Sequence, residues 1–375
     1  MFVPHNIYMT EQLCVSVIVP FYNAQFYIKN CLDVLSNQDF DRPFEVIMIN
    51  DASTDNSKNI VEKCTLKNIR LYSIKSNGGP AKARNLGIIQ AKGEYIFFLD
   101  VDDAIDPNTL TELYNTAKET LSDFVFCDSK WIENYQNQRS NIFSYHQDKV
   151  IKNSELTETM KKRLYNPKYM GGPLGCKGRL IRRSIIVDNN IMFEEQLRYL
   201  EDEIFMWDFL AFVKNAKYIR KQLYTYYVHP NVNTAVIEGL NRGFPVSKFK
   251  LIKKHIENSF RQRGCSSLEV EKLGDQGLIY FIINVLISYS KSMIQGKVEI
   301  EDSTKCRRKI IDSILSDQDV IKTVYKYSKS KDESAWIPRA IAWQSSWLLE
   351  FLCTRRAKKI LNMRRKSDTN SISTD

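Results

Sequence analysis

The stretch NGGPAKARNLGIIQAKGEYIFFLDVDD, residues 77–103, decides the fold of this chain. Two glycines and a proline come first, and a helical segment is expected over about Ala81–Ala91. The apolar run Tyr95–Leu99 is typical of a buried strand, and three aspartates follow it closely. A turn, a helix, a strand and an acidic turn in this order indicate one repeat of an α/β sheet.

The segments upstream repeat this alternation. Short runs rich in Val and Ile are separated by helical segments, which implies parallel βαβ units. Strands are expected at Val15–Val19, Glu45–Ile49 and Ile69–Ile74, and helices at Ala24–Asn37 and Ser57–Lys67, with Asn23 as the cap of the first helix. Downstream, Pro107 opens a further helix and DFVFCD (123–128) supplies a further strand, whereas residues 131–168 are polar and irregular.

Polar clusters stand where each of the four strands ends. They are FYN after the first strand, NDASTD after the second, NGG after the third and DVDD after the fourth. A sheet of this kind binds ligands outside the carboxyl ends of its strands. The pattern therefore predicts a nucleotide site at this edge of the sheet.

Three carboxylates on one turn, Asp100, Asp102 and Asp103, are the most distinctive of these clusters. They repel one another, and a hard cation such as Mg²⁺ or Mn²⁺ would neutralise them, with a diphosphate supplying further ligands. The alternative is an acidic turn whose Asp106-Pro107 pair begins a helix.

Other strand ends add groups that suit a phosphorylated ligand. Asp51 and Asp55 follow the second strand, and Lys82 and Arg84 come just after the glycines. Glycine lets a ligand approach the backbone, and the two cations can reach phosphate or base oxygens. The alternative for Arg84 is a solvated helix face.

Taken together, SVIVPFYN (16–23), NDASTDNS (50–57) and residues 77–103 resemble the inverting glycosyltransferase family 2. The motifs follow the family's order and spacing over Val15–Asp103, and a looser resemblance extends through KGRLIRRSII and LRYLEDEIFMWDFL to about residue 235. The resemblance implies a GT-A fold, an α/β architecture with a Rossmann-like, mostly parallel sheet flanked by helices, followed here by a C-terminal helical extension.

The resemblance also implies a donor site. Asp51 would accept a hydrogen bond from the base, and Arg84 would lie by the base or the phosphates with Lys82 nearby. Asp100-Val101-Asp102 would form the DxD motif, with Asp102 on the metal and Asp100 near the ribose. The residues implied to line the nucleotide are Pro20, Tyr22 and Asn23.

A catalytic base is implied by Glu201-Asp202, which matches the family's acidic pair in an EDxxF pattern. An inverting transfer is a single displacement, so one carboxylate must take the proton of the acceptor hydroxyl, and Asp202 is the residue that we expect to do so. The alternative is the acidic first turn of a helix, where carboxylates interact favourably with the helix dipole.

His229 follows LYTYYV, where the family often has a polar or basic residue near the diphosphate, so it is a second candidate metal ligand. The alternative is a structural histidine. Arg179-Leu180 stands where the family often has a Lys-Leu pair preceded by tryptophan, and a glycine-rich stretch, 171–175, precedes it. This departure bears on the choice of acceptor.

The length of 375 residues suits one large domain and an appendage. We expect a lead over 1–14, a catalytic domain over 15–235, a helical and basic region over 240–366, and a disordered tail over 367–375. Eight scattered cysteines without a CxxC pair indicate reduced, buried thiols. The start of the chain does not have the pattern of a signal peptide, and the longest apolar segment, Leu278–Tyr289, is interpreted as a buried helix that does not cross a membrane.

The C-terminal region carries aromatic residues at helical spacing, followed by a run of Arg and Lys. It is interpreted as a helix packed on the catalytic domain, as a helix lying on an anionic membrane surface, or as a nucleic-acid binder. The last is disfavoured because no reader motif accompanies it, so no nucleic-acid partner is expected. The aromatic residues are Trp336, Trp343, Trp347 and Phe351.

The sequence thus predicts an inverting glycosyltransferase that uses Mn²⁺ or Mg²⁺ and moves a sugar from a nucleotide-diphosphate sugar, such as a UDP-sugar, to a hydroxyl of a glycan or lipid-linked glycan. The expected setting is cell-surface polysaccharide assembly, in the cytoplasm or on the inner face of the membrane. One alternative is a nucleotidyltransferase, which would carry a Gly-rich basic loop where this chain has FYNAQFY (21–27). Another is an inactive membrane scaffold, against which the intact Asp51, Asp102 and Asp202 argue.

Overall fold

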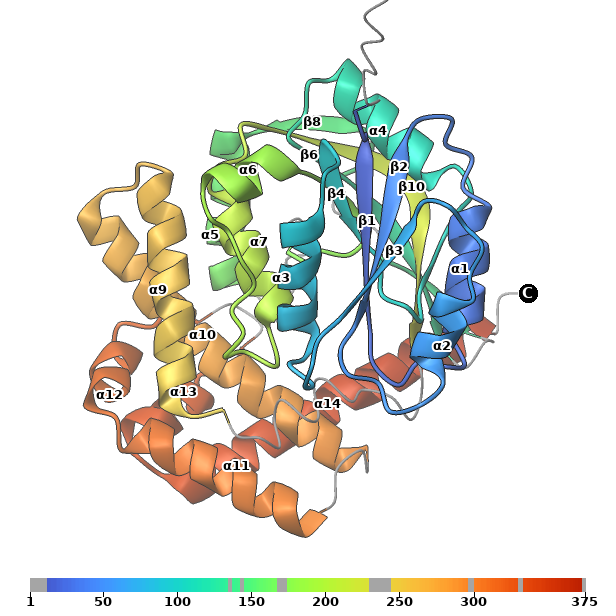
Figure 1. The fold of residues 1–375 in the computed structure, drawn as a ribbon. Helices are drawn as coiled ribbons and strands as arrows, with labels where there is room; N and C mark the ends of the chain where they lie inside the picture. The colour runs from blue at the N-terminus through green and yellow to red at the C-terminus, as the bar shows by residue number, and fades with distance from the viewer. Residues whose placement is uncertain are drawn as a thin grey trace, which may run out of the picture. The chain divides into compact units, whose positions relative to one another are not determined.

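A computed structural model describes residues 12–133, 137–141, 145–166, 174–228, 244–295, 300–329 and 333–372. The chain divides into two compact units (Figure 1). The sheet unit comprises Met1–Lys152, Cys176–Phe193 and Val213–Val228, and the helical unit comprises Asn153–Gly175, Glu194–Phe212 and His229–Asp375. These units interleave along the sequence, and the expected boundary between residues 235 and 240 stays a prediction.

The sheet unit is built on a sheet of ten strands among the described residues, with the order β3-β2-β1-β4-β9-β6-β10-β5. The first four strands in this order are parallel to one another, as the alternation of the sequence predicts. The antiparallel β9 lies between β4 and β6. The strands are β1 (Val15–Phe21), β2 (Phe44–Asn50), β3 (Ile69–Ser73), β4 (Tyr95–Phe98), β5 (Ala104–Ile105), β6 (Phe124–Glu133), β7 (Asn137–Asn141), β8 (Lys149–Lys152), β9 (Arg179–Arg182) and β10 (Asn215–Val228).

Helices cover both faces of the parallel part of this sheet (Figure 1). Alternate residues of β1, Val15, Val17 and Val19, belong to one core cluster with the apolar faces of α1 and α4. Ile18 points the other way, toward Gly87 of α3, where a side chain on the glycine would meet it at 2.3 Å. The helices of this unit are α1 (Ile28–Ser36), α2 (Ser57–Glu62), α3 (Pro80–Gln90), α4 (Thr109–Glu119) and α6 (Arg183–Asp188).

Two local expectations are wrong. Asn23 does not cap α1, because Tyr27 occupies the position before the helix and the Asn23 side chain accepts a hydrogen bond from the Thr54 backbone instead. The segment 131–168 is not irregular throughout. It contains the end of β6, then β7, β8 and a helix, because its polar strands pair at the edge of the sheet, where one face needs no apolar side chains.

The helical unit confirms the expected helical character of the C-terminal region. Its longest buried element is α10, which Ser266 caps by accepting a hydrogen bond from the Glu269 backbone at 3.3 Å. The helices are α5 (Asn153–Tyr165), α7 (Glu201–Leu210), α9 (Val246–Gln262), α10 (Ser267–Ile294), α11 (Ile300–Leu315), α12 (Gln318–Val324), α13 (Trp336–Ala342) and α14 (Ser346–Ile372).

The apolar segment 278–289 is part of this 28-residue helix, which is long and apolar enough to cross a membrane by length and composition. The most apolar window of α10 is 61% buried, and the helix packs against α5, α9, α12 and α14 as a core helix does. The backbone of α14 continues to Ile372, into the segment for which disorder was expected, because neither Gly nor Pro interrupts it. All eight cysteines lie within the described residues and are free thiols.

Candidate active site

The carboxyl ends of three adjacent parallel strands align at one edge of the sheet. Phe21 at the end of β1 pairs with Asn50 at the end of β2, and Asn50 pairs with Ser73 at the end of β3. On the other side of β1, Ile18 pairs with Phe98, the last residue of β4. The polar loops that follow these strands therefore meet at this edge, as the sequence predicts.

The loops after β1 and β2 are joined by reciprocal hydrogen bonds. The Asn23 amide oxygen accepts from the Thr54 backbone at 2.8 Å, and the Asn23 backbone donates to the Ser53 hydroxyl at 3.0 Å. Asn23 and Ala52 both have positive φ, 47° and 60°. Such backbone strain in a non-glycine residue persists only where its surroundings hold it, and it concentrates at functional sites. Tyr22, beside Asn23, is exposed.

Asp51 fixes the glycine turn that precedes α3. Its buried carboxylate accepts hydrogen bonds from the backbone N–H groups of Gly78 at 2.8 Å and Gly79 at 2.7 Å. Gly79 has a φ of 87°, which glycine adopts without strain, and Pro80 then begins the helix. Each carboxylate oxygen can accept a second hydrogen bond, so this positioning role is compatible with the base contact that the resemblance implies.

Two cations hold Asp100. The Arg84 guanidinium donates to Oδ1 at 2.9 Å, and Lys177 Nζ donates to Oδ2 at 2.8 Å. Arg84 is nearly buried and lies 5.5 Å from the centre of the Phe193 ring, so it is not on a solvated helix face. Burial by itself would raise the pKa of Asp100, but Lys177 and Arg84 hold it well below its usual range. Asp100 is therefore ionised, with its charge already balanced.

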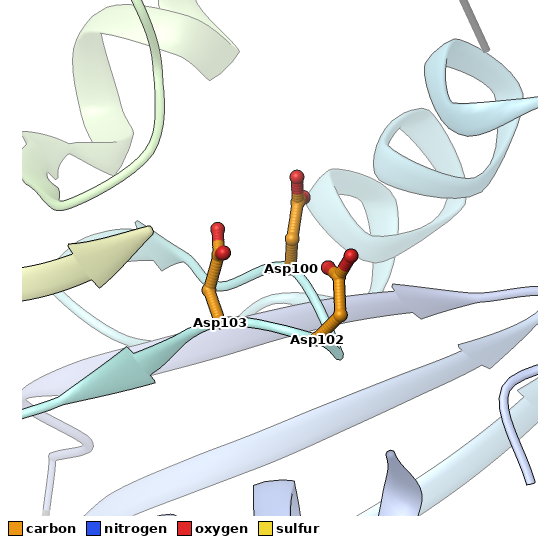
Figure 2. Close-up of side chains that lie close together, drawn as sticks. All are labelled: Asp100, Asp102 and Asp103. Carbon is orange, nitrogen blue, oxygen red and sulfur yellow. The ribbon is translucent and has the colours of Figure 1, made fainter. Parts of the chain in front are cut away.

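Asp103 is the buried member of the acidic turn. Its carboxylate accepts from the Tyr224 hydroxyl and from the Tyr227 backbone, the latter at 3.1 Å. Burial raises its pKa well above the ordinary value, and the neighbouring Asp100 and Asp102 raise it further. Asp102 is only partly buried. In Figure 2 the three side chains leave the turn on the same side, and ligand atoms of all three lie within 4.8 Å of one another.

Comparison with known proteins now identifies the domain. Residues 16–186 match the model of the family described as glycosyl transferase family 2. The chain carries a glycosyltransferase family 2 domain. The match favours this class over a nucleotidyltransferase, the alternative that the sequence left open.

Curated relatives and solved structures agree with this assignment. Poly(ribitol-phosphate) beta-N-acetylglucosaminyltransferase TarS of Staphylococcus aureus is 33% identical over 51% of this chain, and the putative glycosyltransferase EpsH of Bacillus subtilis is 32% identical over 58%. The chain spans 31% of the length of the former and 62% of the latter. A crystal structure of residues 1–349 of TarS in complex with UDP-GlcNAc has a TM-score of 0.67, with 22% identity and 92% of both chains covered. The GT-A fold with C-terminal helices is confirmed.

The family 2 domain suits a hard metal ion at the acidic turn. The donors are all carboxylate oxygens, which Mg²⁺ and Mn²⁺ prefer. Asp102, which the resemblance places on the metal, is partly exposed at this turn, and its role as a ligand stays a prediction. His229 lies outside the described residues, so its role as a ligand stays a prediction.

Three other residues that the sequence singled out also lie in the sheet unit. Lys82 lies in the first turn of α3 and is half-buried. Val101 packs against the main core cluster, which holds the acidic turn against the sheet. Pro20 is within β1, one residue before its end. We still expect these residues to line the nucleotide.

Sequence reasoning missed Lys177 and Tyr224, although both contact the acidic turn. Lys177 stands within the segment KGRLIRRSII that resembled the family, but the chain separates it from Asp100 by 77 positions. Tyr224 is 121 positions from Asp103. From the sequence alone, a tyrosine within an apolar strand such as β10 is interpreted as a core residue. The pairing of β5 with β10 brings Tyr224 to the acidic turn.

Glu201 and Asp202 begin α7 in the helical unit. Leu200, just before the helix, has a φ of 72°, and the Asp202 side chain accepts a hydrogen bond from the Glu203 backbone at 2.8 Å. Glu201 is buried and Asp202 is partly exposed. The pair is thus an acidic first turn, and Asp202 is the more accessible of the two carboxylates. Its catalytic role stays a prediction.

Gly178 is required for the position of Tyr224, and replacing it with Ala is expected to destabilise the chain by about 2 kcal/mol or more. Its φ is 66°, and an added Cβ would lie 2.9 Å from the Tyr224 ring. Gly264 is a matched control, because its φ is 78° but its Cβ would meet nothing within 4 Å. Chemical denaturation of both variants separates backbone strain from the clash. Equal losses of stability would contradict the proposed packing of Gly178 on Tyr224.

Proposed function

We propose that this chain transfers a sugar, with inversion, from a UDP-sugar to a hydroxyl of a cell-surface glycan or other cell-surface polymer. The observation that carries this proposal is the acidic turn at the end of β4. It lies at the same sheet edge as the glycine turn held by Asp51. Two cations, Arg84 and Lys177, donate hydrogen bonds to its Asp100. This arrangement offers groups for a base, a diphosphate and a metal ion in one place.

The relatives support the donor and the kind of acceptor. Solved TarS structures carry UDP and UDP-GlcNAc, and one curated relative is the poly(ribitol-phosphate) beta-glucosyltransferase of Bacillus spizizenii. Both curated names describe β-linked products on a phosphate-rich polymer. The net charge of +10 suits such an anionic acceptor. The proposed setting is the cytoplasm, at the inner face of the membrane.

In the proposed reaction each group has a defined role. Asp202 accepts the proton of the attacking hydroxyl, which becomes more acidic as its bond to the anomeric carbon forms. Arg84 and Lys177 fix Asp100 on the donor side and provide positive potential for the departing diphosphate. A Mg²⁺ or Mn²⁺ ion held by Asp102 would neutralise charge on that diphosphate. No covalent sugar–enzyme intermediate is needed in a single displacement.

The proposal is tested by the thermal stability of the chain with UDP, GDP, CDP and their sugars, each with Mn²⁺ or with EDTA. A ligand at about 100 times its Kd adds about 2.7 kcal/mol to the folded state, so UDP and a UDP-sugar are expected to raise the Tm, and only when metal is present. Release of UDP from the stabilising donor then reports turnover. No Tm increase and no UDP release with any donor would contradict a transferase and favour the inactive scaffold.

A further inference from the structure

Four aromatic residues of α13, α14 and the turn between these helices are exposed. Trp336, Trp343, Trp347 and Phe351 are each between 49% and 73% exposed. Single exposed apolar side chains are ordinary, but four large rings within sixteen residues are not. A helix that used these rings to pack against protein would bury them. We refer to these four residues as the aromatic face.

The side of α14 opposite Trp347 and Phe351 packs inside the helical unit and fixes the orientation of the helix. Leu349, Cys353 and Ala357 recur at helical spacing and are fully buried. The largely buried Arg307 of α11 donates to the Glu350 carbonyl at 2.9 Å and to the Thr354 hydroxyl at 3.1 Å. These contacts lock the rotation of α14 about its axis, so the outward direction of Trp347 and Phe351 is a property of the folded unit.

The rings on this face form two ordered pairs. Trp336 and Trp343 lie 6.1 Å apart between ring centres, and Trp347 stacks on Phe351 at 5.7 Å with an angle of 7° between the planes. The Arg339 guanidinium lies 5.1 Å from the centre of the Trp336 ring. Paired aromatic rings next to a cation present an amphipathic surface, apolar in the middle and charged at its edge.

Positive charge continues the aromatic face along α14 (red in Figure 1). Arg355 lies four residues after Phe351, which itself lies four residues after Trp347, and Lys358 lies three residues after Arg355. All four side chains are on the exposed side of the helix. Residues 335–366 contain eight Lys and Arg residues but a single acidic residue, Glu350, which pairs with Arg307. The surface around the rings therefore attracts anions and repels other cations.

We propose that the aromatic face and the basic side chains of α14 bind the anionic surface of a lipid bilayer. Indole rings favour the boundary between headgroups and acyl chains, and Arg and Lys reach the lipid phosphates from beside them. A second copy of this chain fits less well, because its own α14 would bring the same cations opposite. An anionic bilayer complements both the rings and the charge. This inference goes beyond the proposed transfer reaction and does not depend on it.

The test is flotation of the full chain with vesicles, without a sugar donor. The chain is expected to bind phosphatidylcholine vesicles that contain phosphatidylglycerol. Binding to pure phosphatidylcholine vesicles is expected to be weaker by about tenfold or more, and binding to the anionic vesicles is expected to fall as salt is added. The variant Trp347→Ser/Phe351→Ser is expected to lose about tenfold or more in partition coefficient. The matched control is Tyr325→Ser in the same unit, since Tyr325 and Trp347 are both 73% exposed.

A second pair of variants tests the charge. Changing Arg355, Arg356, Lys358 and Lys359 to Gln is expected to reduce binding to anionic vesicles. The control makes the same change at four exposed lysines of the sheet unit and is expected to reduce binding to anionic vesicles far less. These lysines are Lys29, Lys63, Lys67 and Lys92. In the wild type, lipids brominated near the headgroup should quench Trp fluorescence, a measurement that needs no variant.

Three results would overturn the proposal. The first is equal binding to neutral and anionic vesicles, or none to either. The second is unchanged vesicle binding by the Trp347→Ser/Phe351→Ser variant, with no quenching by brominated lipids. The third is self-association of the wild type, seen by sedimentation and lost in that variant, without vesicle binding, which would assign the aromatic face to a second copy of the chain.

Discussion

Replacing Asp202 with Asn is expected to lower kcat for sugar transfer by about a thousandfold while donor affinity stays the same. The amide cannot take the proton of the acceptor hydroxyl at neutral pH. It still presents an oxygen to the Glu203 backbone, the contact that Asp202 makes at 2.8 Å, so the start of α7 is retained. The measurement is the initial rate of UDP release with saturating donor and acceptor, together with the Kd of the donor.

Two further variants sharpen this result. Glu201→Gln changes the buried neighbour, and a smaller effect on kcat is expected because that side chain is less accessible to an acceptor. Asp208→Asn is a control that places an Asp-to-Asn substitution elsewhere on α7, at a residue that pairs with His255 at 2.7 Å. It should leave kcat unchanged even if it lowers the Tm. If Asp202→Asn retained most of the wild-type rate, or if Glu201→Gln were the slower variant, the assignment of the base to Asp202 would be wrong.

Replacing Asp102 with Asn is expected to lower kcat/KM for the donor by about 100-fold to 1000-fold and to abolish the difference between Mn²⁺ and EDTA in donor binding. Asp102 is a partly exposed carboxylate of the acidic turn. An amide there removes a negative charge and a strong oxygen ligand without changing the volume of the side chain. Calorimetric titration of UDP in each condition measures the effect.

Asp106→Asn provides the control for this variant. Asp106 follows the acidic turn closely in the chain, and its carboxylate accepts from Lys130 at 3.3 Å. Its loss should leave the metal dependence of UDP binding intact. Metal-dependent UDP binding that survived in Asp102→Asn would show that another group holds the ion, and the metal assignment would have to move from Asp102.

The parallel half of the sheet and the acidic turn could be predicted because their signals are local. Each strand is a short apolar run, and each polar cluster follows its strand directly. Sequence reasoning also led to Asp51 and Arg84, but not to the contacts that they make. That Asp51 holds the backbone of Gly78 and Gly79 depends on two loops meeting in space, which one segment read alone cannot reveal.

Two partners of the acidic turn, Lys177 and Tyr224, could not be predicted, because they come from segments that follow the parallel strands β1 to β4 in the chain. Lys177 reaches Asp100 from the residues before β9, which inserts beside β4, and Tyr224 comes from β10. Alternation of strands and helices carries no information about such insertions. The exposure of Trp347 is equally invisible in the sequence, since an aromatic stripe at helical spacing is usually buried.

The interleaving of the two units limits how the family 2 domain can be used in protein engineering. The helix that carries Asp202 is covered by later sequence: Phe260 packs on Trp207 with ring centres 5.7 Å apart, and Ser259 donates to the Trp207 carbonyl at 2.7 Å. A fragment cut after residue 235 would retain every motif of the family yet leave that helix without its cover. Chimeras that exchange donor or acceptor preference between relatives therefore need junctions beyond α9.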